Sequence, residues 1–192
     1  MKLKARKTYR LGVGILFPLI YYFSPNKIVV EMFIAYLLGI MTTIEVVRKI
    51  APVFWSTMAK HSKGILKEEP GKITGTTAYL LSCFIIIAAF QKYIAITAIL
   101  FLLFGDMAAT LVGVRFGRIK FFGGKKSLEG SLAFLVTCLI IGYLLRFIFP
   151  ELGVAKILWG SLGATIIEAI PLPIDDNFTV GIGTALILWL VP

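Results

Sequence analysis

The residues of this sequence that most clearly could do chemistry are a short basic segment and an aspartate in the apolar run before it. The segment extends from Arg115 to Lys126, and the apolar run before it contains Asp106. A charged side chain within a membrane span is costly unless it is paired, so it is a functional candidate by default. Because cations beside a carboxylate suit phosphate chemistry, we expect an anion site here, with Asp106 as a catalytic residue. The alternative role for Asp106 is an interhelical hydrogen bond that only supports the structure.

The end of this basic segment has the composition of a phosphate-binding turn. Two glycines give backbone freedom, the following lysines supply charge, and a helix that starts after Ser127 would present unpaired N–H groups. It is not a Walker loop, because the chain has an extra lysine and no predicted strand before it. Alternatively, Ser127 is only a helix cap, Glu129 a first-turn acid and the lysines orientation signals. The candidate nucleotide-binding residues are Arg115, Lys120, Gly124, Lys125, Lys126, Ser127, Glu129 and Gly130, of which Lys126 and Glu129 are also catalytic candidates.

The composition indicates that a membrane-embedded bundle positions these residues. The 192-residue chain is 58% hydrophobic and 16% charged, with a mean hydropathy of +0.91. A membrane-spanning helix needs about 20 apolar residues. Seven apolar runs are candidates: 11–23, 28–44, 73–90, 93–113, 128–149, 154–170 and 178–191. Since the runs lack the alternation of barrel strands, we predict an all-α polytopic membrane protein with about seven transmembrane helices and a single domain, residues 1–192.

The connections between these runs alternate between rich and poor in Lys and Arg. The basic ones precede the first run, follow the second and follow the fourth. This is the positive-inside pattern for an N-terminus in the cytoplasm and a C-terminus outside. Because topology explains most of the net charge of +10, we expect no nucleic-acid partner.

Carboxylates gather on the same predicted side of the membrane. Of ten acidic residues, only Glu31 and Glu151 fall on the outer side. Mg²⁺ usually binds one or two carboxylates together with substrate phosphates, and phosphoryl transfer depends on positioning and charge neutralisation. An isolated Asp-Asp-Asn turn is otherwise a solvated loop with a helix cap. The candidate metal ligands are Asp106, Glu168, Asp175 and Asp176, and further candidates are Lys67, Glu68, Glu69 and Asn177.

Small residues recur at every fourth position around Asp106. They are Gly105, Ala109, Gly113 and Gly117, a spacing that lets another helix approach closely. Asp106 and Gly113 are seven residues apart and share nearly one face of a helix. The carboxylate should therefore point into the bundle rather than at lipid.

Several separated motifs resemble one enzyme family. The stretch from Gly105 to Gly117, followed by Lys126 to Ser131, is similar to the core of the CTP-dependent lipid-alcohol kinases, which include dolichol kinase, phytol kinase and yeast-type diacylglycerol kinase. The matching flanking elements are Lys67-Glu68-Glu69 with Thr74-Gly75-Thr76, and Glu168 with Asp175-Asp176-Asn177. The family's R-K-x-x-H start is not matched, since Arg10 follows the Arg6-Lys7 pair. A more distant similarity runs to the phosphatidate cytidylyltransferases, but the Asp-Asp-Asn ending favours the kinases.

The resemblance implies that CTP phosphorylates the hydroxyl of a membrane lipid alcohol, such as polyprenol, dolichol, phytol, geranylgeraniol or diacylglycerol. The expected partners are CTP, Mg²⁺, the lipid alcohol and the lipid bilayer, and a homodimer is compatible with them. One alternative is a cytidylyltransferase that makes a CDP-activated lipid. The other is a non-enzymatic transporter, for which inverted repeats and broken helices are expected and none is found. The small size and the lack of a transit sequence predict a prokaryotic plasma membrane, with the site facing the cytoplasm.

Overall fold

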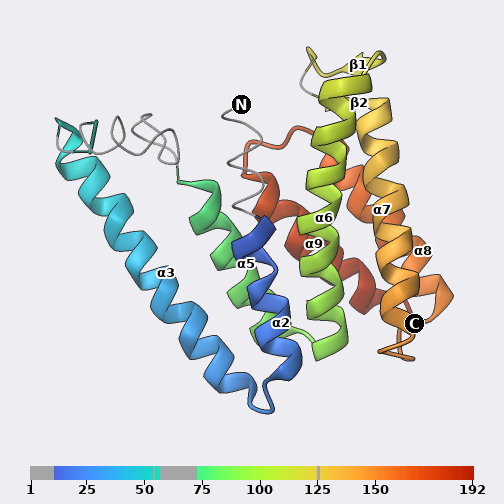
Figure 1. The fold of residues 1–192 in the computed structure, drawn as a ribbon, viewed down its shortest axis with the longest axis horizontal. Coiled ribbons are helices and arrows are strands. Elements are labelled where there is room, and N and C mark those ends of the chain that lie inside the picture. Colours follow the sequence, from blue (N-terminus) through green and yellow to red (C-terminus); the bar gives the residue numbers. More distant parts are fainter. Residues whose placement is uncertain (1–10, 54, 57–72, 125) are drawn as a thin grey trace.

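A computed structural model describes residues 11–53, 55–56, 73–124 and 126–192. The described chain is a helical bundle with one small hairpin (Figure 1). The helices are α2 (Leu16–Phe23), α3 (Lys27–Ile50), α5 (Gly75–Ala89), α6 (Lys92–Phe116), α7 (Leu128–Arg146), α8 (Val154–Ala169) and α9 (Asp176–Leu190). The predicted all-α class is therefore confirmed, apart from the two-residue strands β1 (Lys120–Phe121) and β2 (Lys126–Ser127).

Each predicted apolar run coincides with a helix, but the helices differ in length. Among the described residues, α3, α6 and α7 are long and apolar enough to cross a membrane. The helices α5 and α9 have 15 residues each, which corresponds to about 22 Å at 1.5 Å per residue, against about 30 Å of hydrocarbon. The number of crossings and the sides of the two termini therefore stay predictions.

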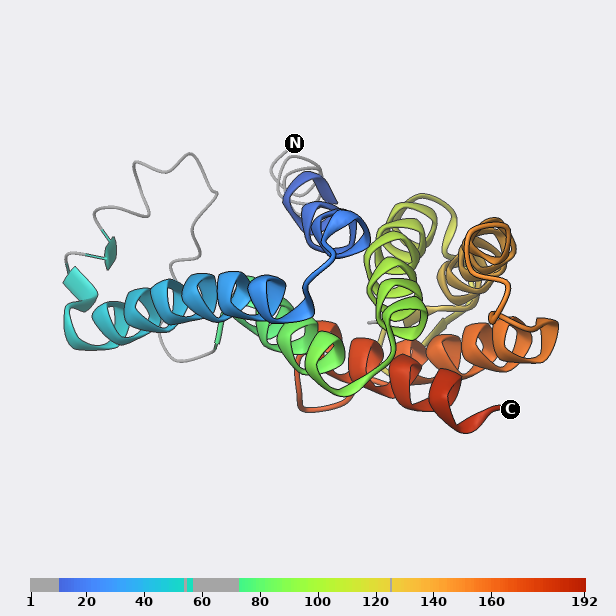
Figure 2. The same cartoon turned by 90° about the horizontal axis from the view of Figure 1, so that it is seen from below.

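The helix α6 lies at the centre of the bundle, and α3 lies at its edge. The helix α6 packs against α7, α9, α2 and α5, and it buries Phe101 completely. Consecutive helices run in alternating directions (Figure 1). Seen from below, α3 extends away from the other helices (Figure 2), and it packs mainly against α5.

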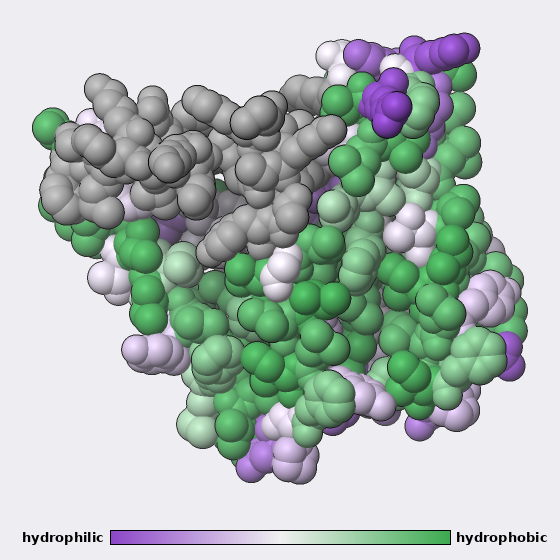
Figure 3. All heavy atoms as spheres, viewed as in Figure 1, coloured by the Kyte–Doolittle hydropathy of each residue, from purple (hydrophilic) through white to green (hydrophobic). Residues whose placement is uncertain are grey.

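The outer surface of the bundle is apolar. Large hydrophobic side chains that are exposed include Tyr36 at 69%, Trp159 at 61% and Ile166 at 60%. In Figure 3 hydrophobic residues cover the helices, whereas hydrophilic ones gather at the end that carries the β1–β2 hairpin. An apolar surface of this extent on helices of this length is typical of a membrane protein.

The hairpin is the one departure from the predicted all-helical fold in the described chain. Strands β1 and β2 pair antiparallel, with Lys120 opposite Ser127. Their connection turns back because Phe122, Gly123 and Gly124 all have positive φ angles, of 51°, 68° and 85°. Glycine adopts this conformation without steric cost, so Gly124 provides backbone freedom as predicted. A short strand thus does precede α7, but it is not the buried strand of a Walker loop.

Candidate functional site

The stripe of small residues on α6 brings α7 very close. A Cβ atom added to Gly130 of α7 would lie 2.9 Å from the Ala109 carbonyl oxygen, and one added to Gly113 would lie 3.0 Å from Ser127 Oγ. Contacts this short leave no room for a side chain. The predicted close approach of a second helix is therefore confirmed, and that helix is α7. It places the start of α7, with Lys126 and Ser127 before it, directly against α6.

The N-termini of α5, α7 and α9 each carry a side-chain cap. Ser127 Oγ accepts a hydrogen bond from the Gly130 amide at 3.2 Å, and Asp175 Oδ1 accepts one from the Asn177 amide at 3.0 Å. The hydroxyl of Thr74 accepts the Thr77 amide at 3.4 Å. Ser127 is thus the helix cap that the sequence suggested as its alternative role. Helix N-termini attract anions, because their free N–H groups and dipoles point outward.

Lys126 of β2 is joined to α8 and α9 by two ion pairs. Its Nζ donates to Glu168 Oε1 at 2.6 Å and to Asp176 Oδ2 at 2.9 Å. Glu168 is buried, and its other carboxylate oxygen accepts a hydrogen bond from Ser131 Oγ at 3.4 Å. Residues from β2, the end of α8 and the start of α9 therefore meet at one ammonium group. This Lys126 cluster, made of Lys126, Glu168, Asp176 and Ser131, unites a predicted nucleotide-binding residue with two predicted metal ligands.

The surroundings of Lys126 keep it charged. Burial alone would lower the pKa of its ammonium group, but hydrogen bonds and charge from Glu168 and Asp176 more than offset that effect. The net result is a pKa above the ordinary value of 10.5. A charged ammonium between the N-termini of α7 and α9 is suited to binding phosphate.

Asp106 lies in a pocket that none of the Lys126 cluster residues line. The pocket is lined by Leu11, Tyr79, Leu102, Leu103, Asp106, Met107 and Asn177. Tyr79 donates a hydrogen bond from its hydroxyl to the Gly14 carbonyl at 2.9 Å, which holds the first helical turns of the described chain against the pocket. The pocket therefore combines one carboxylate and one amide with apolar walls, a combination suited to the hydroxyl end of an apolar molecule.

The start of α9 connects the pocket with the Lys126 cluster. Asp176 belongs to the cluster, whereas the next residue, Asn177, lines the pocket. Asn177 is 4% exposed, and its side-chain amide donates to the Gly75 carbonyl of α5 at 3.2 Å. Asp175, which caps α9, is itself exposed to solvent. The predicted Asp-Asp-Asn element is therefore an ordered helix start that joins α5, α7 and α9.

The remaining predicted residues lie at or near this end of the bundle. Arg115 is exposed in the last turn of α6, where its guanidinium lies 5.3 Å from the Phe116 ring centroid. Lys120 and Gly124 are exposed in the hairpin. Residues Lys67, Glu68, Glu69 and Lys125 lie outside the described residues, so their roles stay predictions.

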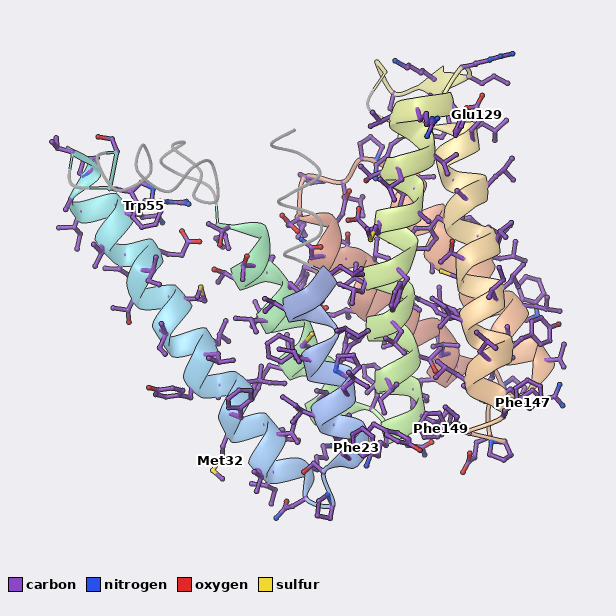
Figure 4. All side chains as sticks on the ribbon, viewed as in Figure 1. Phe23, Met32, Trp55, Glu129, Phe147 and Phe149 are labelled. Carbon is purple, nitrogen blue, oxygen red and sulfur yellow. The ribbon has the colours of Figure 1, made fainter. Side chains whose placement is uncertain are left out.

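Glu129 has a visible role in closing the connection between α6 and α7. Its Oε1 accepts hydrogen bonds from the backbone amides of Arg118 at 3.0 Å and Ile119 at 3.2 Å. In Figure 4 its side chain lies at the hairpin end of α7. This contact fixes the hairpin on the helix start. Its participation in catalysis stays a prediction.

The Lys126 cluster also contains the oxygen donors that a divalent cation would use. Among the described residues, no group of three or more His, Cys, Asp or Glu side chains comes together. Glu168 and Asp176 nevertheless contact the same Lys126 nitrogen, so their carboxylates lie close together. Since Mg²⁺ bound with a nucleotide takes one or two carboxylates and phosphate oxygens, this pair fits such an ion.

Two residues of α3 were not predicted as part of the site. Glu45 and Arg48 form an ion pair of 3.0 Å, and Arg48 is 2% exposed. From the sequence they were expected only to be charges on the cytoplasmic side of the membrane. A signal was present, since an acid and a base three residues apart at the end of an apolar run lie on one helix face.

Comparison with known proteins gives one uncharacterized relative over nearly the whole chain and, over parts of it, relatives that are named phytol kinase or dolichol kinase. The chain is 29% identical, over 98% of its length, to an uncharacterized protein of Rickettsia prowazekii, of which it covers 94%. It is 35% identical, over 60% of its length, to the phytol kinase of Synechocystis, and it spans about half, 53%, of that protein. It is 52% identical to the dolichol kinase of Saccharomyces cerevisiae over 44 residues, which are 22% of this chain and 8% of that protein. No family model and no solved structure matches.

Proposed function

We propose that this chain, a relative of the lipid-alcohol kinases, is a CTP-dependent kinase that phosphorylates the hydroxyl of a membrane lipid alcohol. The observation that carries the proposal is the start of α9, where Asp176 belongs to the Lys126 cluster and Asn177 to the Asp106 pocket. In this proposal the Lys126 cluster would take the nucleotide and the Asp106 pocket the alcohol, so that the two substrates would meet at adjacent residues. A reaction between a water-soluble and a lipid substrate requires this arrangement.

The triphosphate of CTP would bind at the hairpin end of the bundle. Lys126 supplies a charge that is already oriented by two carboxylates. The free N–H groups at the start of α7 supply further donors, and Arg115 and Lys120 are exposed beside them. Lys125 is a further candidate outside the described residues. Phosphoryl transfer requires this kind of positioning and charge neutralisation more than covalent catalysis.

Mg²⁺ would be held by Glu168 and Asp176, whereas the other two predicted ligands, Asp106 and Asp175, do not gather with this pair among the described residues. A bound Mg²⁺ would neutralise charge on the phosphate oxygens of the donor. When a nucleotide binds, Lys126 can exchange one carboxylate contact for a phosphate contact, because its side chain is 16% exposed and unbranched. The pairing of Lys126 with both acids therefore matches a site in which the lysine and the ion share one polyphosphate.

Asp106 would orient the acceptor alcohol and take its proton. The alcohol oxygen attacks the γ-phosphorus of CTP, the bond from that phosphorus to the β,γ-bridging oxygen breaks, and CDP leaves. The hydroxyl proton passes to the Asp106 carboxylate and then to solvent. Leu102 and Leu103 on the pocket wall would contact the first carbons of the lipid tail. Such walls suit polyprenol, dolichol, phytol, geranylgeraniol and diacylglycerol alike, so the assay below decides which alcohol is the substrate.

The proposed location is the plasma membrane of a prokaryote, with the hairpin end facing the cytoplasm. The basic residues of the hairpin support this orientation. The nucleotide would then approach from the cytoplasm while the alcohol remains in the inner leaflet. The chain would act either as a monomer or as a homodimer.

The test is a transfer assay in detergent with the purified protein. The five alcohols and their monophosphates are each incubated with Mg²⁺ and with CTP labelled at either the γ- or the α-phosphate, and γ-labelled ATP is tested as an alternative donor. The expected result is transfer of the γ label alone, from CTP, to one class of alcohol, and its loss when the metal is chelated. Transfer of the α label to a lipid phosphate would instead indicate a cytidylyltransferase. Absence of transfer to every alcohol would refute the proposed activity.

A further inference from the structure

The helix α3 carries a buried ion pair near its C-terminal end, between two of its own side chains. Most of α3 presents apolar side chains outward, such as Met32 at 60% exposure (Figure 4). Near the hairpin end of the bundle, however, Glu45 and Arg48 are 12% and 2% exposed and lie 3.0 Å apart. Replacing a buried ion pair with apolar residues is often neutral or stabilising, so stability alone does not account for the pair. Its contacts with the next helix suggest another role.

Glu45 reaches across to the N-terminus of α5. Its Oε1 accepts a hydrogen bond from the Thr74 backbone amide at 2.6 Å and another from Thr77 Oγ1 at 3.2 Å. Thr74 is the N-cap of α5, so the carboxylate lies at the positive end of that helix dipole. Arg48 holds the other carboxylate oxygen and thereby fixes the orientation of Glu45. The ion pair thus lies directly against the start of α5, which Thr74 caps with its own hydroxyl.

The start of α5 in turn contacts the site. The Gly75 carbonyl accepts the side-chain amide of Asn177, which lines the Asp106 pocket. A Cβ atom added to Gly75 would lie 3.1 Å from Asn177 Nδ2 and 3.6 Å from Asp175 Oδ2, so α5 and α9 touch at this point without an intervening side chain. A displacement of the α5 start would therefore move Asn177, and with it the junction between the pocket and the Lys126 cluster.

We infer that Glu45 is a positioning residue, which acts through the α5 start to hold Asn177 and the α9 start in place for transfer to the acceptor alcohol. The inference rests on the proposed function. Glu45 does not contact the Lys126 cluster, so its loss should leave substrate binding nearly intact and mainly slow the transfer step. Misplacement of a reacting group by about 1 Å can cost about a hundredfold in rate.

The test compares two substitutions of the same chemistry on the same helix. Glu45→Gln removes the charge while it keeps the size and one acceptor oxygen. Glu31→Gln is the matched control, because Glu31 pairs with Lys27 at 3.6 Å near the other end of α3. We expect Glu45→Gln to lower kcat about ten- to hundredfold with KM for both substrates within about threefold, and Glu31→Gln to change neither. Unchanged kcat in folded Glu45→Gln would overturn the inference.

Hydrogen exchange supplies a measurement that does not depend on activity. Backbone amides at 75–80 and 176–180 should exchange faster in Glu45→Gln than in the wild type or in Glu31→Gln. A lowered kcat with unchanged exchange at 176–180 would contradict the inference that Glu45 acts through the start of α5. If the wild type transfers no phosphate to any alcohol, the proposed function fails, and exchange alone decides whether Glu45 holds the α9 start.

A second variant covers the case in which Glu45→Gln does not fold. Thr77→Val removes one of the two donors to Glu45 and keeps the shape and the charge. We expect a smaller decrease of kcat, about three- to tenfold, and faster exchange at the same amides. Thr77→Ser, which keeps the hydroxyl, should restore both. If Thr77→Val behaves like the wild type in both measurements, the inference is refuted.

Discussion

Replacement of Lys126 by Met would test whether the Lys126 cluster is a charge-balanced unit. Lys126→Met keeps the length of the side chain but leaves Glu168, which is 5% exposed, without its ammonium partner at 2.6 Å. Breaking a buried ion pair by removing one partner costs about 3–5 kcal/mol. Ser131 still donates to Glu168, and Lys126 itself is 16% exposed, so the expected loss is smaller, about 2–3 kcal/mol.

This loss is measurable as a thermal shift in detergent. For a chain of this size it corresponds to a Tm lower by about 5–10 °C. Lys120→Met is the control, because Lys120 is exposed in the same hairpin, and its change in free energy should stay within about 0.5 kcal/mol. Phosphate transfer by Lys126→Met should fall below detection even at a temperature where the variant is fully folded.

A second substitution shows how much of the lost stability comes from the unpaired carboxylate and how much from lost packing of the lysine side chain. Glu168→Gln in the Lys126→Met background removes the unbalanced carboxylate and keeps an acceptor for Ser131. The double variant should regain most of the lost stability, to within about 1 kcal/mol of the wild type, while transfer remains absent. If Lys126→Met is as stable as Lys120→Met, or if the two substitutions are simply additive, the assignment of the cluster as a charge-balanced unit is wrong.

Three further predictions concern the pocket, the helix contact and the charge of the cluster. Asp106→Asn should abolish phosphate transfer from labelled CTP, while its Tm in thermal unfolding stays within about 2 °C of the wild type. Retained transfer would remove Asp106 from the mechanism. Gly130→Ala should lower the free energy of unfolding by about 1–3 kcal/mol, because its methyl group would lie 2.9 Å from a carbonyl oxygen of α6. The control Gly39→Ala has nothing within 4 Å and should be neutral or stabilising. Equal unfolding curves for the two variants would contradict the close α6–α7 contact. The pKa of Lys126 is raised above 10.5, so its ion pairs contribute stability that is complete below that pH and is lost as the pH rises through the folded pKa. The difference in Tm between the wild type and Lys126→Met should therefore stay constant from about pH 8 to 10 and shrink above 10.5. A decrease already near pH 8 would show that Lys126 loses its proton at a lower pH than expected.

The positions of the helices could be predicted from sequence, although α3 continues to Ile50, beyond the predicted end of its apolar run at residue 44. Apolar runs, the small-residue spacing on α6 and the cap at Ser127 depend on residues within a few positions of one another. Such signals act locally, because helix formation and capping are determined by neighbouring side chains. The short hairpin was not predicted, because two-residue strands show no periodicity.

The assembly of the site was decided by tertiary structure. Lys126 lies 42 and 50 residues from its two acidic partners, and Asn177 lies 102 residues from the Gly75 carbonyl that it contacts. The sequence placed these residues on one predicted side of the membrane, but it could not tell which pairs would meet. It also indicated no role for Glu45, although that carboxylate accepts the backbone amide of the α5 N-cap residue, which lies 29 residues later. Residue types and spacings specify where each helix begins and which face it buries. Only the packing of helices against one another determines which charged atoms come within hydrogen-bonding distance, because that depends on the crossing of whole elements rather than on any local pattern.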